Sequence, residues 1–216
     1  MRGDVKKKRR RADDRLAALD SSMFESHQVS RYFEHRRRQN RIKIRGKPAR
    51  ADANRRKSRT LKRVPKLSLA VHAASHLILA AKATTGLGPD FGHFKPLLEQ
   101  ALSRMKLRWV VADAGYDSES NHRTARQDLK VRSLIPSIAG RPGTGMPKGF
   151  YRRLMRRRLI QIPYKKRYGQ RWQIETVNSM MKRNLTSACR SRTAWGRKRD
   201  LLLRAITHNL MLIANL

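Results

Sequence analysis

The stretch YGQRWQIETVNSMMKR, residues 168–183, predicts a helix with two different faces. At about 100° per residue, one face is apolar and suits a protein core. It consists of Ile174, Val177 and Met181. The edge beside it is a narrow stripe of four polar residues. These are Tyr168, Arg171, Glu175 and Lys182. The helix is therefore expected to pack by one side and to present charged and aromatic groups beside the core.

Glu175 is an isolated carboxylate, because no other Asp or Glu occurs between Asp128 and Asp200. One interpretation is an ordinary i, i+4 ion pair with Arg171, worth only about 0.3–0.5 kcal/mol. The other is a functional carboxylate. The helix alone leaves both interpretations open.

The chain has 216 residues and a formal net charge of +37, from 52 Lys and Arg against 15 Asp and Glu. A compact chain with this excess repels itself unless a polyanion neutralises it, so we expect double-stranded DNA or another nucleic acid as partner. An anionic membrane surface is the alternative. However, no apolar run is long enough to span a bilayer, and the N-terminus lacks the apolar region of a signal peptide. We expect no membrane association and a cytoplasmic, nucleoid-associated protein.

Cysteine and histidine chemistry is disfavoured. Cys189 is the only cysteine, so intramolecular disulfides and cysteine-based zinc sites are excluded. The seven histidines show no ligand-like spacing, which disfavours a histidine-based metal site. The polar groups that remain for chemistry are carboxylates in a cationic chain.

The apolar pattern predicts a mixed α/β domain with a central sheet. Residues 66–84 suggest two strands around a turn at 74–76, although their alanines leave a helical interpretation open. Further strands are expected over 16–20, where the run ends on a carboxylate, within 107–118 and over 131–136. Helices are expected over 94–105, 121–129, 167–185 and 197–216. An order of three strands, helix, strand, helix and strand before the final helices indicates an α/β fold.

Two segments are strongly basic. Residues 31–66 contain sixteen Lys or Arg and almost no apolar periodicity, so we expect a flexible connection that orders on a polyanion. Residues 140–158 begin with Gly/Pro turns and end in a short basic helix or strand. The second segment belongs to a small basic insertion, about 139–167, ahead of the last helical carboxylate.

Two further acidic residues follow apolar strands. Asp20 ends the run LAAL, and Asp113 ends the run WVVA. Desolvating a carboxylate at a strand end is costly, unless it meets a cation or solvent. Two such strands and one helical Glu can bring Asp20, Asp113 and Glu175 together, and three adjacent negative charges favour divalent cations. Magnesium suits such an oxygen-ligand site, and a pair of ions can promote in-line phosphoryl displacement.

These motifs together resemble the DDE transposases of prokaryotic insertion sequences. Tyr168, Arg171, Glu175 and Lys182 match the Y-x2-R-x3-E-x6-K signature. ADAGYDS at 112–118 is similar to the second-Asp motif, and LAALDSS at 16–22 to the first. ITHNLMLI is similar to the closing helix of the family. The resemblance covers about residues 14–216.

The resemblance implies a ribonuclease H-like fold, whose sheet begins with three antiparallel strands. It implies that Asp20, Asp113 and Glu175 are catalytic and hold two Mg²⁺ ions, or Mn²⁺, for cleavage at transposon ends and strand transfer into target DNA. It also implies that Tyr168, Arg171 and Lys182 bind DNA near the cleaved phosphate. A homodimer in a synaptic complex is a further expectation from the family.

The domain prediction is a basic tail at 1–13 followed by a catalytic domain at 14–216. Family members usually carry a DNA-binding region ahead of the first Asp, whereas nineteen residues precede Asp20 here. The alternatives are therefore a decayed, truncated transposase fragment or a non-catalytic basic nucleic-acid-binding protein. The second alternative explains the charge but not the arrangement of the three carboxylates.

Several other residues are expected to be structural. Asp117 is assigned to a turn or helix cap, and Asp90 to a helix N-cap. His208 and Asn209 are expected to form a satisfied polar pair in an apolar helix. The three tryptophans are expected to be core or interface residues rather than base-stacking groups. They are Trp109, Trp172 and Trp195.

Overall fold

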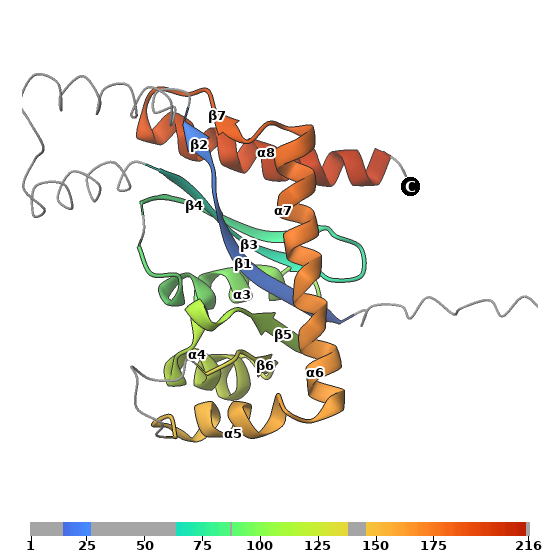
Figure 1. The fold of residues 1–216 in the computed structure, drawn as a ribbon. Helices are drawn as coiled ribbons and strands as arrows, with labels where there is room; N and C mark the ends of the chain where they lie inside the picture. Colours follow the sequence, from blue (N-terminus) through green and yellow to red (C-terminus); the bar gives the residue numbers. More distant parts are fainter. Residues whose placement is uncertain (1–14, 27–63, 87, 138–145, 215–216) are drawn as a thin grey trace, which may run out of the picture.

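The structure is a computed structural model that describes residues 15–26, 64–86, 88–137 and 146–214 (Figure 1). The strands are β1 Leu16–Met23, β2 Glu25–Ser26, β3 Pro65–His72, β4 Ile78–Thr85, β5 Trp109–Ala112, β6 Arg132–Leu134 and β7 Ala188–Cys189. The α-helices are α3 Phe94–Leu102, α4 Glu119–Arg123, α5 Phe150–Arg158, α6 Ile162–Tyr168, α7 Trp172–Asn184 and α8 Ala194–Ala214. Shorter helical turns are η1 Phe91–His93, η2 Ala114–Tyr116, η3 Thr124–Asp128 and η4 Gly169–Arg171.

Five strands form the central sheet, in the order β4-β3-β1-β5-β6. The first three along the chain, β1, β3 and β4, pair antiparallel. β5 then pairs parallel with β1, and β6 parallel with β5. Three antiparallel strands followed by two parallel ones confirm the predicted ribonuclease H-like mixed sheet with flanking helices. The strand reading of residues 66–84, with its turn after His72, is also confirmed.

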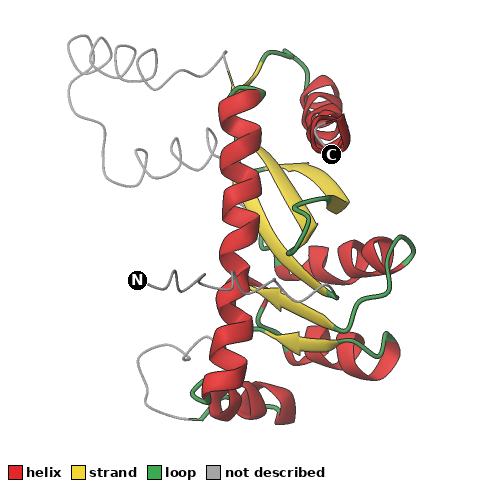
Figure 2. Cartoon of the chain, turned by 90° about the vertical axis from the view of Figure 1, so that its right-hand side faces the viewer, coloured by secondary structure: helices red, strands yellow, loops and turns green. Residues whose placement is uncertain are grey.

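Helices cover both faces of the sheet (Figure 2). On one face, α7 packs against β1 and β3, and α8 packs against β3 and β4. On the other face, α3 packs against the opposite side of β1 and β4. Because β1 lies between these two layers, both of its faces are apolar over Leu16–Leu19, as is expected of a central strand.

The predicted helix over 167–185 is interrupted near its start. α6 ends at Tyr168, the 3₁₀ turn η4 covers Gly169–Arg171, and α7 begins at Trp172. The three segments still follow one another as a continuous column along the sheet (Figures 1 and 2). The apolar face is as predicted, since Ile174, Val177 and Met181 are fully buried. The single-helix prediction is wrong at its N-terminal end, where Tyr168 belongs to α6.

The described part of the basic insertion consists of α5 and α6. Two acidic residues attach α5 to the loop and helix that follow β5. Asp117 accepts hydrogen bonds from Arg152 Nε at 3.0 Å and Nη2 at 2.7 Å. Glu119 accepts from the backbone N–H groups of Tyr151 and Arg152 at 3.1 and 3.2 Å, which caps α5. Asp117 ends the 3₁₀ turn η2, which agrees with its prediction as a turn or cap residue, and its fully buried carboxylate also forms an ion pair with Arg152 that the sequence did not predict.

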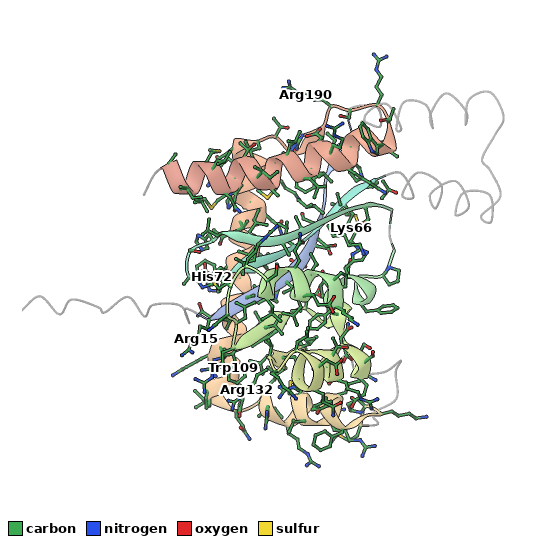
Figure 3. All side chains as sticks on the ribbon, turned by 180° about the vertical axis from the view of Figure 1, so that it is seen from behind. Arg15, Lys66, His72, Trp109, Arg132 and Arg190 are labelled. Atoms are coloured by element: carbon green, nitrogen blue, oxygen red, sulfur yellow. The ribbon has the colours of Figure 1, made fainter. Side chains whose placement is uncertain are left out.

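Trp109 is the only one of the three tryptophans in the core. It is buried at the start of β5, with the guanidinium groups of Arg132 and Arg167 lying 5.2 and 4.1 Å from its ring centroid (Figure 3). Trp172 and Trp195 are 54% and 67% exposed, so they are not core residues, and the interface role that was the other expectation stays a prediction for them. The type of residue does not distinguish the buried tryptophan from the two exposed ones. Their positions do, because Trp109 lies in a central strand, whereas Trp172 and Trp195 lie at the starts of helices.

The polar pair at the end of the chain is satisfied, as predicted. His208 is buried, and its Nε2 atom lies 3.2 Å from the backbone oxygen of His76. The Asn209 amide accepts from Ile78 N at 2.8 Å and donates to Ile78 O at 2.9 Å. Asn209 therefore completes the main-chain hydrogen bonds at the start of β4.

The predicted basic tail and most of segment 31–66 lie outside the described residues. At the end of that segment, Pro65 and Lys66 belong to β3. In the described ranges, no helix combines the length and the apolar character needed to cross a membrane.

Candidate active site

Asp20 and Asp113 follow the last pair of a parallel ladder. β1 and β5 pair from Leu16 with Trp109 to Leu19 with Ala112. The next residue on each strand is an aspartate. Because neighbouring strands lie about 4.8 Å apart, this register brings Asp20 and Asp113 to the same edge of the sheet.

Asp20 has an environment that penalises its negative charge. Its pKa is raised to about 6, chiefly by burial, and the carboxylates of Asp113 and Glu175 also contribute to the rise. A hydrogen bond from Ser21 N at 2.8 Å and the charge of Arg171 lower it. Two acidic neighbours from different elements therefore lie within electrostatic range of Asp20.

Asp113 is held by the backbone of the turn that follows it. Its side chain caps η2 by accepting from Gly115 N at 2.9 Å. A Cβ at position 115 would lie 3.0 Å from the same carboxylate oxygen, which explains glycine in the ADAGYDS motif. Its backbone remains extended at φ −73° and ψ 174°, so Asp113 continues the direction of β5.

Arg171 links the strand carboxylate to the helix carboxylate. Its Nη2 donates to Glu175 Oε1, one helical turn further on. Its Nη1 lies 3.9 Å from Asp20 Oδ2. The i, i+4 pair that the sequence suggested is therefore present, and the same guanidinium also reaches β1. Arg171 partly neutralises two carboxylates that would otherwise repel each other.

The described residues contain no group of three acidic, histidine or cysteine side chains placed to hold a metal ion directly. Arg171 gives the physical reason, since its guanidinium contacts both Asp20 and Glu175. The chemistry of the donors nevertheless fits a divalent cation. Three carboxylates come from three elements, and Asp20 senses the charge of both others. Hard oxygen ligands of this kind suit Mg²⁺ or Mn²⁺.

Tyr168 and Lys182 lie at opposite ends of the site. Tyr168 is half-buried against the sheet, and burial raises its pKa while the neighbouring Arg171 lowers it. Lys182 lies in the last turn of α7, with its Nζ 5.2 Å from the centroid of the Phe24 ring. The six residues of the sequence-predicted site thus lie along the column formed by α6, η4 and α7 and at the adjoining strand ends.

An open pocket of about 570 Å³ lies between β1 and α7. It is lined by Asp20, Ser21, Ser22, Glu175, Asn178, Ser179, Lys182 and Arg183. Two carboxylates at one end and two cations at the other make it suitable for a phosphodiester and its counter-ions. Asn178 and the serines were not predicted from the sequence as site residues, because polar residues on a helix or strand carry no specific signal.

A polar cluster beside Asp20 was also missed. Ser21 Oγ lies 2.7 Å from Ser68 Oγ and 2.9 Å from Tyr116 Oη, and it donates to Asp90 Oδ1 at 3.0 Å. Asp90 also forms an ion pair with buried Lys66. Asp90 does precede η1 as predicted, but its carboxylate makes no capping bond. The available signal was Lys66 at the start of an otherwise apolar strand, where a buried cation needs a partner.

Comparison with known proteins identifies the family of the chain. The family model described as transposase DDE domain matches residues 11–210. Among solved structures, the chain is similar to the catalytic core domain of BIV integrase, with 8% identity and a TM-score of 0.42 over 90% of this chain and 83% of that one. This likeness is too weak to support a further conclusion. Curated proteins give no match. Since the family model spans most of its length, the chain belongs to the DDE transposase domain family.

Proposed function

We propose that this chain is the catalytic domain, residues 14–216, of a Y-R-E-K type transposase from a prokaryotic insertion sequence. It cleaves DNA at transposon ends and transfers the strands into target DNA. The observation that carries the proposal is the meeting of Asp20 and Asp113 at one sheet edge, with Glu175 linked to Asp20 through Arg171. The net charge of +37 supplies attraction for DNA.

In this proposal Asp20, Asp113 and Glu175 hold two Mg²⁺ ions, for which Mn²⁺ can substitute. When bound, the ions supply Lewis acidity for in-line displacement at phosphorus. The strand carboxylates are fixed by the ladder between β1 and β5, whereas Glu175 is positioned by the buried face of α7. This division places two ligands on the sheet and one on a helix.

The cationic and aromatic residues of the signature bind DNA in this proposal. Arg171 contacts carboxylates in the structure, and the same guanidinium can bind a phosphate once these are otherwise neutralised. Lys182 lines the pocket and supplies a second phosphate contact. Tyr168 lies next to Arg171 and contributes a polar contact or base stacking.

A metal-dependent nicking assay on DNA that carries the ends of the element tests the proposal. Glu175→Gln removes a charge from the site while keeping its shape, so cleavage should be lost and DNA binding retained. Glu99→Gln is the matched control, because Glu99 is an exposed residue of α3 with only a 3.9 Å ion pair to Lys95. Equal cleavage by the wild type and Glu175→Gln would refute the catalytic role.

Absence of cleavage by either protein while salt-sensitive DNA binding persists would favour the alternatives. These are a non-catalytic basic nucleic-acid-binding protein and a decayed, truncated transposase fragment. Binding strength that falls steeply with salt, without cleavage, would be their signature.

We also propose that the chain acts as a homodimer on nucleoid DNA in the cytoplasm. The exposed side of α8 supports the dimer through a stripe at 3-4-3 spacing, in which each residue is 56–59% exposed. The stripe consists of Leu203, Ile206, Leu210 and Ile213. Between residues 201 and 214 the one Arg or Lys, Arg204, is buried, so two copies can meet there without close charge repulsion.

Light scattering tests this surface. Ile206→Glu should convert a dimer into a monomer, whereas Lys198→Glu, on another side of α8, should leave it dimeric. A wild-type chain that is monomeric at high concentration would contradict the proposal.

A further inference from the structure

Asn178 carries a buried polar atom without a partner at the pocket. Its side chain lies on α7, one turn beyond Glu175, and only 8% of the residue is exposed. It lines the same pocket as Asp20 and Glu175. Its Oδ1 atom has no hydrogen-bond partner among the residues that the structure describes.

An unpaired buried amide oxygen is costly. Leaving such an acceptor unsatisfied costs about 1–3 kcal/mol, and folded proteins rarely tolerate it without a reason. Its neighbours Val177 and Met181 are apolar and fully buried, so an apolar side chain at 178 would avoid this cost. An asparagine at this position is explained if a group bound in the pocket becomes the partner of its Oδ1 atom.

The chemistry of the pocket narrows the identity of that group. An anionic phosphate oxygen would repel Oδ1, because both are acceptors, whereas a cation or a water bound to one would attract it. A carboxamide oxygen is a hard, neutral ligand of the kind that Mg²⁺ and Ca²⁺ accept. It adds a donor without adding negative charge beside Asp20 and Glu175, whose repulsion Arg171 already relieves in part.

We propose that Asn178 Oδ1 is a fourth oxygen donor of the metal centre, on the side of Asp20 that faces Glu175, and contacts the divalent cation directly or through one of its waters. This inference rests on the proposed function, because it requires the carboxylate site to bind metal. Asn178 is then a ligand residue in addition to the three carboxylates. The pocket between β1 and α7 is then the place where the cation binds.

Mn²⁺ binding to the full chain, without DNA, tests the role of Asn178. Free Mn²⁺ is measured by its electron paramagnetic resonance signal during titration. Asn178→Ala should weaken Mn²⁺ binding about tenfold, the scale on which supporting ligands act. Asn178→Asp should restore or tighten it, because a carboxylate also offers oxygen. Asn184→Ala is the matched control, since Asn184 is an exposed amide at the end of α7 that does not line the pocket, and it should leave the affinity unchanged.

Thermal unfolding without metal distinguishes a ligand from a structural residue. If Asn178 Oδ1 has no partner in the absence of the cation, its removal loses no stabilising hydrogen bond. Asn178→Ala should then unfold at the same Tm as the wild type without metal. A lowered Tm with unchanged Mn²⁺ affinity would overturn the inference and show that an ordinary buried water satisfies the amide.

Asp20→Asn separates the inference from the proposal on which it rests. If Asp20→Asn abolishes Mn²⁺ binding and Asn178→Ala leaves it unchanged, only the role of Asn178 fails. If Asp20→Asn leaves Mn²⁺ binding unchanged, or if the wild type binds none at millimolar concentration, the metal centre fails, and the inference fails with it.

Discussion

Replacing Arg152 by alanine should destabilise the fold strongly, because it leaves a buried carboxylate without its cation. Asp117 has a fully buried side chain and accepts three hydrogen bonds from the guanidinium of Arg152, which is itself 24% exposed. Removing one partner of a buried ion pair costs about 3–5 kcal/mol. We expect the lower end of that range, about 3 kcal/mol, since water can reach the position that Arg152 leaves.

Urea and thermal denaturation, followed by circular dichroism at pH 7, measure this loss. For a chain of this size, about 3 kcal/mol corresponds to a fall in Tm of roughly 6–12 °C. Arg157→Ala is the control, because Arg157 is an exposed residue of the same helix and should change stability by less than about 0.5 kcal/mol. Replacing both partners, as in Asp117→Asn with Arg152→Met, should recover part of the loss. Equal Tm values for Arg152→Ala and Arg157→Ala would refute the reasoning.

Two other sites give predictions of known direction. Burial lowers the pKa of His122 to about 4, so the folded state binds fewer protons than the unfolded state, and stability should fall as the pH drops from about 6.5 towards 4. This contribution of His122 to the free energy of unfolding approaches about 3 kcal/mol. The difference between the urea midpoints at pH 7.5 and at pH 4.5 should therefore be smaller for His122→Asn than for the wild type. The same difference in both proteins would contradict this. Gly149→Ala should cost more than about 1 kcal/mol in a chemical denaturation experiment, because Gly149 has a φ of +103° and a Cβ there would collide with the Glu119 carboxylate. Gly169→Ala, in open space and with helical φ, should be neutral or stabilising, and a loss as large as that of Gly149→Ala would argue against a local steric cause.

The sheet could be predicted because its strands are short apolar runs that end at chemically distinctive residues. LAALD and WVVAD each give a strand and its terminal acid, and the structure places these strands side by side. The pairing itself is a long-range property. Nothing within either run states that Leu19 pairs with Ala112, and the antiparallel pairing of the first three strands was expected only from the resemblance to a family.

The helix of the site was predicted with less accuracy, for a local reason. Helical periodicity identified the buried face of α7, because burial depends on spacing that a short break hardly changes. The break at Gly169–Arg171 was missed because a 3₁₀ turn at the end of a helix has no strong sequence signature. Arg171 reaches Asp20 from that turn, so the link between strand and helix could not be predicted from a regular helical wheel.

Asp117 shows a second limit of sequence reasoning. Asp before Ser in a loop is typical of a cap, and its partner Arg152 lies 35 positions away among many other arginines. In a chain with 52 basic residues, the identity of the one that pairs with a given carboxylate is a property of the fold.

The central position of β1 sets how firmly each part of the site is held. β1 is hydrogen-bonded to strands on both edges, so its amides should exchange with deuterium only when the whole domain opens. α7 is attached by side-chain packing and continues through η4 into α6, so it can shift as a rod without breaking a ladder. Asp20 is therefore the fixed reference of the site, and the distance from it to Glu175 is the quantity that a shift of α7 would change.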